Sequence, residues 1–131
     1  MMVGSRNASQ ACASCKYQRK KCDPHCPLAP FFPQHRRKDF MNVHKVFGVR
    51  NVLKLTKNLG FKEKSEAMKT MIYQADVRVK DPVGGCCRVI SELQNRIKHL
   101  EAEYRLLLEQ LAVCRVQKQA KAPHLYKQQQ L

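Results

Sequence analysis

Long apolar runs are missing from this sequence of 131 residues. No stretch approaches the roughly 20 consecutive apolar residues that a bilayer-spanning helix needs, which argues against a membrane protein. The first fifteen residues, MMVGSRNASQACASC, also lack the apolar core of a secretory signal. We therefore expect an intracellular protein, in a reducing compartment where disulfides rarely persist.

Catalytic arrangements are also missing. We find no nucleophile–base pair, no paired carboxylates and no glycine-rich phosphate loop. The sequence thus predicts a protein that is not an enzyme and has no small-molecule substrate. It contains no internal repeat and no clear strand-like alternation, so we predict a mainly α fold: a small four-cysteine zinc module, short helices and a C-terminal coiled-coil helix.

Acidic residues are few. The chain has 10 Asp and Glu against 25 Lys and Arg, and its formal net charge is +15. Residues 1–60 hold 12 of these cations but only 2 of the acids. Such an imbalance favours an anionic partner, either nucleic acid or an acidic membrane surface. The lack of a membrane-spanning segment makes the membrane the weaker alternative.

Four of the seven cysteines lie within fifteen residues, CASCKYQRKKCDPHC, at the spacing C-x2-C-x6-C-x3-C. Two such pairs can place four thiolates around one tetrahedral Zn²⁺. Prolines at 24, 27, 30 and 33 prevent long helices in residues 12–33, so the metal would supply folding energy. His25 could replace one thiolate, but it adjoins Cys26, and we do not expect both of these neighbours to bind the same ion. The predicted zinc ligands are Cys12, Cys15, Cys22 and Cys26.

Cations fill the segment between the second and third cysteines, KYQRKK. A charge run is often only a solvated face. Attached to a metal-fixed scaffold, however, it can contact phosphates and guanine edges. We predict DNA contacts from Lys16, Arg19, Lys20 and Lys21, and phosphate contacts of second rank from Arg36, Arg37, Lys45 and Arg50.

Residues 34–85 form a predicted helical middle region. Phe40, Val43 and Phe47 recur at helical spacing until Gly48, and a second short helix follows as far as residues 58–60. A third apolar stripe begins near Ser65 and ends at the turn DPVGG, residues 81–85. We expect residues 1–11 to be disordered.

Residues 86–115 carry a heptad pattern and predict a coiled coil. Its seam consists of Ile90, Leu93, Ile97, Leu100, Tyr104, Leu107 and Leu111, followed by Cys114. The seam could pack on the chain's own helices. The 3.5-residue period persists over many residues, which favours pairing with a second chain instead. In a parallel pair of helices, Arg96 of one chain would also make an attractive contact with Glu101 of the other. Residues 116–131 lose the pattern, so we expect a flexible tail.

The sequence contains four blocks in order: the cysteine block followed by LAPFFP, then VHKVFG, then DPVGGC, and finally the leucine heptads. With these four blocks, it resembles the LOB-domain (lateral organ boundaries) family of plant transcription factors. The zipper resembles its class I branch. This resemblance implies a nuclear, sequence-specific DNA-binding protein involved in plant development, with a zinc-binding cysteine block, a dimerising coiled coil and a DNA-linked proline at Pro82.

The sequence departs from the family pattern at three places. The family's Gly-Ala-Ser reads Gly48-Val49-Arg50; its D-P-V-Y-G-C-V-G acquires Gly84 and Arg88; and Tyr104 replaces a zipper leucine. CASCKYQRKKCD is also similar to half of a fungal zinc cluster, but the next cysteines, Cys86 and Cys87, are too distant to complete it.

We therefore predict a transcription factor that binds double-stranded DNA through the basic loop, as a homodimer or as a heterodimer with a related protein. The alternative is a zinc-stabilised interaction module that pairs with DNA-binding relatives without binding DNA itself. RNA binding is a weaker alternative because no sheet with stacking aromatics is visible.

Overall fold

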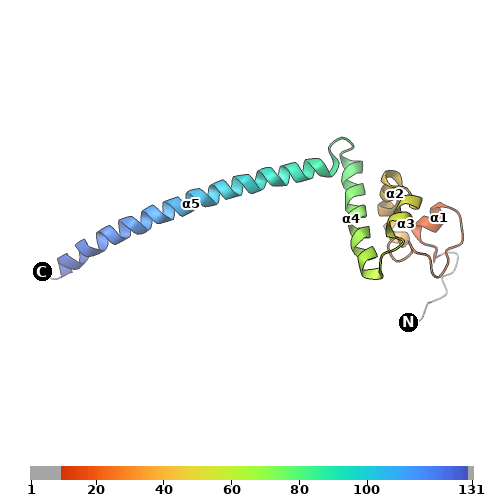
Figure 1. Ribbon diagram of the computed structural model, residues 1–131, viewed down its shortest axis with the longest axis horizontal. Coiled ribbons are helices and arrows are strands. Elements are labelled where there is room, and N and C mark those ends of the chain that lie inside the picture. The colour runs from red at the N-terminus through yellow and green to blue at the C-terminus, as the bar shows by residue number, and fades with distance from the viewer. Residues whose placement is uncertain (1–9, 130–131) are drawn as a thin grey trace. The chain divides into compact units, whose positions relative to one another are not determined.

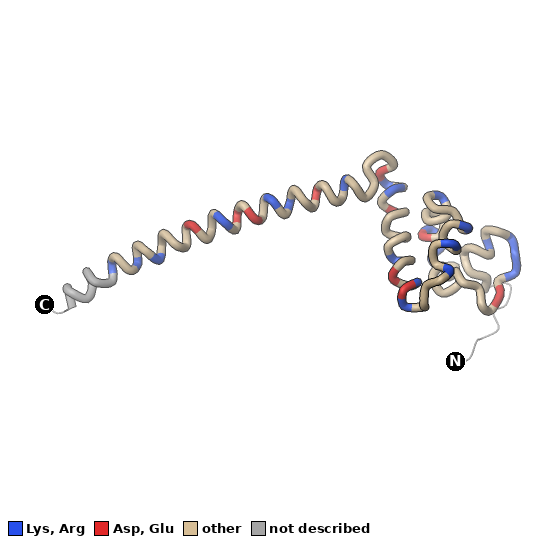
Figure 2. Tube along the Cα trace, viewed as in Figure 1, with Lys and Arg blue, Asp and Glu red and all other residues tan. Residues whose placement is uncertain are grey.

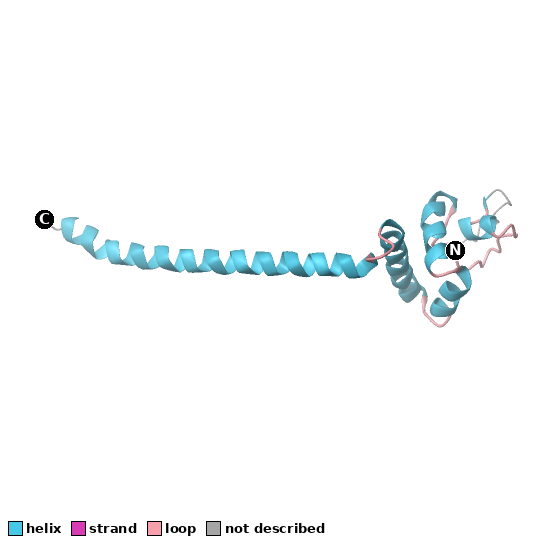
Figure 3. Ribbon diagram, turned by 90° about the horizontal axis from the view of Figure 1, so that it is seen from above, coloured by secondary structure: helices cyan, strands magenta, loops and turns pink. Residues whose placement is uncertain are grey.

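The computed structural model describes residues 10–129, with side chains as far as Lys121 (Figure 1). Most of this range is helical and it contains no strand (Figure 3), which confirms the predicted mainly α fold. The chain divides into two compact units, residues 1–87 and 88–131. The predicted disordered segment 1–11 lies outside the described residues except for Gln10 and Ala11, and Ala11 is buried.

The first unit consists of short helices and one longer helix. These are α1 (Ala13–Tyr17), the 3-10 turn η2 (Gln34–Arg36), α2 (Arg37–Val46), α3 (Val49–Thr56) and α4 (Phe61–Lys80). The third predicted helix thus begins at Phe61 rather than at Ser65. Gly60 is its N-cap, and the Gly60 amide donates to the Glu63 carboxylate at 3.4 Å, which stabilises the earlier start. Apolar periodicity alone does not reveal this start.

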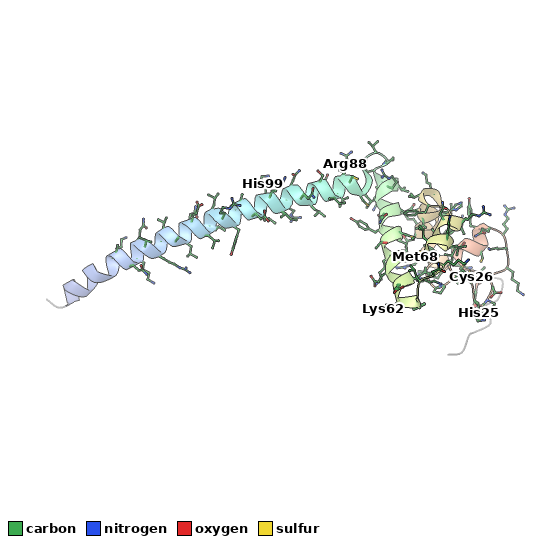
Figure 4. All side chains as sticks on the ribbon, viewed as in Figure 1. His25, Cys26, Lys62, Met68, Arg88 and His99 are labelled. Carbon is green, nitrogen blue, oxygen red and sulfur yellow. The ribbon has the colours of Figure 1, made fainter. Side chains whose placement is uncertain are left out.

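The core of this unit lies where α2 packs along α4. Phe40 and Val43 from α2 meet Met68 and Ala75 from α4, and all four are at most 2% exposed. Met68 lies on the side of α4 that faces the other helices (Figure 4). Leu28 and Phe32, from the proline-rich segment, complete the cluster, so the irregular cysteine segment is packed directly onto the helical layer.

A glycine separates α2 from α3. Gly48 adopts φ 81°, and its amide donates to the carbonyl of His44 at 2.9 Å. Residues with a Cβ rarely adopt this left-handed conformation, so glycine is required at this helix end. The sequence-based break at Gly48 is therefore confirmed.

The DPVGG turn ends α4 as predicted. The Asp81 side chain accepts a bond from the Gly84 amide at 2.9 Å, and Arg78 donates to the carbonyl oxygens of Pro82 and Val83 at 3.0 and 3.3 Å. Gly85 has φ 51°, and a Cβ built there would lie 2.6 Å from the Arg78 guanidinium carbon. The turn thus depends on Gly85 for both its backbone conformation and the space it leaves.

The second unit is formed by the long helix α5, which spans Gly85–Gln129 and begins at the end of the first unit. The helix continues past residue 115, where the heptad pattern stops, to Gln129. The next two seam positions would be Lys118 and Lys121, where like charges replace apolar side chains. Flexibility of residues 116–131 stays a prediction.

The predicted seam of α5 is exposed. Its side chains, from Ile90 to Leu111, keep 46–65% of their surface accessible. No helix in the described residues is long and apolar enough to cross a bilayer.

Candidate metal centre and nucleic-acid interface

The four predicted cysteine ligands come together in the first unit. Their sulfur atoms all lie within 4.8 Å of one another. Sγ of Cys26 lies 3.8 Å from that of Cys12 and 3.7 Å from that of Cys15. A tetrahedral ion with bonds of about 2.3 Å needs sulfur–sulfur separations of about 3.8 Å. The four cysteines could therefore hold a metal ion, and the geometry fits zinc.

Local backbone structure positions this cluster. Cys12 caps α1, and its sulfur accepts a bond from the Cys15 amide at 3.4 Å. The first C-x2-C pair thus occupies the first turn of a helix, where free amides favour a thiolate. His25 is exposed and donates its backbone amide to the Asp23 carboxylate at 2.7 Å, outside the cluster (Figure 4).

Burial controls the protonation of the metal-free thiols. It raises the pKa of Cys12 despite the bond from the Cys15 amide. It also raises the pKa of Cys15, as do the hydrogen bonds to Cys12 and Cys26. At Cys22 burial again acts upward, but hydrogen bonds from the Cys12 backbone and from the other thiols lower the pKa. A metal that binds here must therefore displace the protons of Cys12 and Cys15.

The basic loop follows α1 and returns toward the cysteines (Figure 2). The Lys20 amide donates to the Cys15 carbonyl at 3.1 Å, and the Arg19 amide donates to that of Lys16 at 3.2 Å. This pair of bonds is a Schellman motif, which places Arg19 at the left-handed position, φ 53°. Glycine normally occupies that position, so the arginine adopts a costly conformation in which its cation is held on a closed turn.

An aromatic contact anchors the same loop to α2. The Tyr17 ring lies 5.0 Å from the His44 ring and 5.8 Å from the Phe40 ring. His44 is half-buried in this packing. Its Nδ1 is buried and has no hydrogen-bond partner within residues 10–121. Sequence analysis did not single out Tyr17, because one aromatic among cations gives no periodic signal.

The structure gathers some of the predicted cations and separates others. Lys16, Arg19 and Arg37 line one hollow of about 350 Å³ together with Tyr17 and Gln34. Arg36 is diverted toward Asp39, with Nε 3.9 Å from the carboxylate. Lys20, Lys21 and Lys45 are exposed and do not line this hollow.

Arg50 lies elsewhere, beside a second hollow of about 470 Å³. Three cations that sequence analysis did not identify as site residues, Lys54, Lys57 and Lys64, line that hollow with it. Their spacing in the sequence is typical of ordinary solvent-exposed cations, and only the fold brings them to one hollow.

Comparison with known proteins decides the family. The sequence model described as "Lateral organ boundaries (LOB) domain" matches residues 11–109, which span the cysteine block, the helical layer and most of the heptads. The chain belongs to the LOB domain family. This confirms the resemblance drawn from the motifs and assigns the protein to a family of regulatory proteins rather than enzymes.

Individual LOB relatives agree. LOB domain-containing protein 22 of Arabidopsis thaliana is 50% identical over 107 residues, which cover 82% of this chain and 40% of the relative. Protein LATERAL ORGAN BOUNDARIES, from the same plant, is 42% identical over 103 residues, or 79% and 55% of the two chains. Protein IAL1 of Zea mays is 40% identical over 102 residues, or 78% and 38%. The chain thus spans about half or less of these relatives.

Proposed function

We propose that this LOB protein is a nuclear transcription regulator that binds double-stranded DNA as a zinc-stabilised dimer. The closed, basic loop beside the four cysteines carries the proposal. Cys12, Cys15, Cys22 and Cys26 would hold Zn²⁺, which supplies folding energy to a segment too rich in proline to fold alone. Three thiols are buried and the fourth is half-buried, as suits a closed structural site rather than a catalytic one.

The loop supports contact with a polyanion. Lys16, Arg19 and Arg37 converge on one hollow from α1, its C-terminal turn and α2. An anion in this hollow would be attracted by all three cations, and a backbone phosphate fits this chemistry. Lys20 and Lys21 follow on the same turn and are free to reach base edges, where lysine recognises guanine.

The exposed seam of α5 supports pairing. Seven large apolar side chains at a and d positions, each about half exposed, form the kind of stripe that a second helix covers. The predicted dimerisation residues are those of this seam, Ile90 to Leu111. A parallel pair would bring two basic loops to DNA, and its two-fold symmetry predicts an inverted-repeat target.

The test combines selection and titration. Purified zinc-loaded protein is used to select bound duplexes from a random pool, and the affinity for the selected duplex is measured by anisotropy at several salt concentrations. We expect Arg19→Ala and Lys20→Ala to weaken binding and to reduce the salt slope by about one unit for each lost phosphate contact. Lys98→Ala, an exposed cation on α5, is the matched control.

Two outcomes contradict the proposal. If the selection enriches no sequence and binding is equal for all duplexes, the protein does not recognise sequence. If no duplex binds while a related chain is still captured through α5, the protein is an interaction module that pairs with DNA-binding relatives.

A further inference from the structure

Two neighbouring hollows on the first unit lie outside the basic loop. The larger, of about 470 Å³, is lined between α3 and the start of α4 by Leu53, Thr56 and Pro27 together with cationic side chains. The smaller, of about 220 Å³, is lined by Pro30, Phe31 and Phe61. Pro27 and Lys64 line both hollows, so the hollows adjoin, and we name the two together the groove.

The groove has an apolar floor. Phe61 is 73% exposed although its ring stacks on that of Phe31, with centroids 6.3 Å apart. The exposed Phe61 ring and the prolines that line the same hollow offer an apolar surface to a partner.

The charged residues that line the larger hollow are all cations. Arg50, Lys54, Lys57 and Lys64 line it, and it has no acidic lining residue. None of the four forms an ion pair with a carboxylate within residues 10–121; Glu63, the nearest acid in sequence, turns its carboxylate to the Gly60 amide. These four cations form the positive rim of the groove. The apolar floor and the positive rim together specify the chemistry of the occupant.

We propose that this groove binds an acidic amphipathic peptide segment of a protein partner, with apolar side chains on the floor and carboxylates on the four cations. Such a segment matches both features at once. Duplex DNA would match only the rim, because its phosphates cannot cover Leu53 and Phe61. This binding is distinct from the proposed DNA contact through the loop after α1.

The chain's own segments do not supply this occupant. Residues 1–9 and 122–131 contain no acidic residue. Residues 90–115 of α5 carry four acids and four cations, so a second copy of this helix offers no net complementarity to the rim. A separate acidic partner fits the groove better than this chain does.

The experiment titrates zinc-loaded full-length protein into a fluorescent synthetic peptide that has Leu and Phe at helical spacing and Asp and Glu elsewhere. Lys54→Glu/Lys57→Glu is the test variant. Lys62→Glu/Lys98→Glu is the matched control, since it changes the net charge equally at exposed sites that do not line the groove. Circular dichroism checks that each variant is folded. Leu53→Ala and Phe61→Ala probe the floor.

We expect the peptide to bind, the test variant to weaken binding by about tenfold, and the control to change it little. A peptide with Ser in place of Leu and Phe should bind much more weakly. The inference is overturned if the Ser peptide binds equally well, or if the two double variants behave alike. It is also overturned if no peptide binds while Lys54→Glu/Lys57→Glu reduces duplex affinity as strongly as Arg19→Ala does, since the groove would then be a DNA surface.

Discussion

The Tyr17 ring packs 5.0 Å from the ring of His44, which joins the start of the basic loop to the last turn of α2. Tyr17 is still 46% exposed, so the contact fixes the loop without burying it. Packing between aromatic rings is worth about 0.5–1.5 kcal/mol beyond area burial. Tyr17 therefore acts as a positioning residue for the proposed interface.

Removing this ring should loosen the loop. We expect Tyr17→Ala to weaken duplex binding by about three- to tenfold while zinc content stays unchanged, because the cysteines do not depend on the ring. Tyr17→Phe keeps the ring and should bind as the parent does. Anisotropy gives the affinity and elemental analysis gives the zinc. Equal loss in both variants would point to the hydroxyl group instead.

Arg19 allows backbone strain and charge to be separated. Arg19→Gly should raise the free energy of unfolding by about 1 kcal/mol, because glycine adopts the left-handed conformation at little cost. The same variant should lose duplex affinity. Arg19→Ala loses the same charge but keeps the strain. Denaturant unfolding and anisotropy distinguish these effects: Arg19→Gly should be the more stable of the two, with similarly weakened binding.

Metal binding should depend on pH. Burial raises the pKa of Cys12 and of Cys15, so both hold protons near neutral pH in the metal-free protein and must release them to bind zinc. Zinc affinity should therefore fall as pH is lowered. Calorimetry in buffers of different ionisation enthalpy should report release of about two protons or more per zinc at pH 7.

Removing one proposed ligand should weaken zinc binding. Cys22→Ser should have a lower zinc affinity than the parent protein at the same pH; unchanged affinity would remove Cys22 from the ligand set.

Two glycines with positive φ provide a matched comparison. Gly48→Ala strains the backbone only, since nothing lies within 4 Å of the added Cβ, and should cost about 1–3 kcal/mol at φ 81°, ψ 147°. Gly85→Ala must also displace Arg78 from the carbonyls of Pro82 and Val83, which should add about 1 kcal/mol to its own backbone strain. Thermal unfolding measures both, and the extra cost should vanish in an Arg78→Ala background.

The coiled-coil proposal is tested at its irregular position. Tyr104, 65% exposed, stands at an a position between Leu100 and Leu107. Leucine there should strengthen a parallel pair, so Tyr104→Leu is expected to lower the dimer dissociation constant in sedimentation equilibrium, and Leu100→Lys to raise it by about tenfold or more. Monomers at every concentration in all three proteins would exclude self-pairing.

Short-range patterns in the sequence predicted much of this molecule. Cysteine spacing identified the cluster, helical periodicity identified the α2 and α4 faces, and the breaks at Gly48 and at DPVGG were placed correctly. The start of α4 was missed because Glu63 bonds the Gly60 amide, a contact with no apolar signature. The predicted coiled coil covers residues 86–115, whereas α5 continues to Gln129, because a helix can extend beyond its apolar seam wherever its backbone bonds are favourable.

Side-chain groupings were harder to predict, because they depend on how segments far apart in the chain meet. Arg37 joins Lys16 and Arg19 in one hollow, whereas Arg50 joins Lys54, Lys57 and Lys64 in another. In sequence, all of them are simply cations. Tyr17 likewise gains its role only because His44 and Phe40 lie beneath it.

The cysteine segment and the helical layer share residues. Cys26 packs against both apolar clusters, and the Ala13 amide, one residue after a ligand, donates to the Phe32 carbonyl at 2.8 Å. Loss of the proposed zinc ion from the four thiols would therefore also disturb the interior around Phe40. Under the proposed function, zinc withdrawal would abolish DNA binding by unfolding the first unit, and not only by releasing the basic loop.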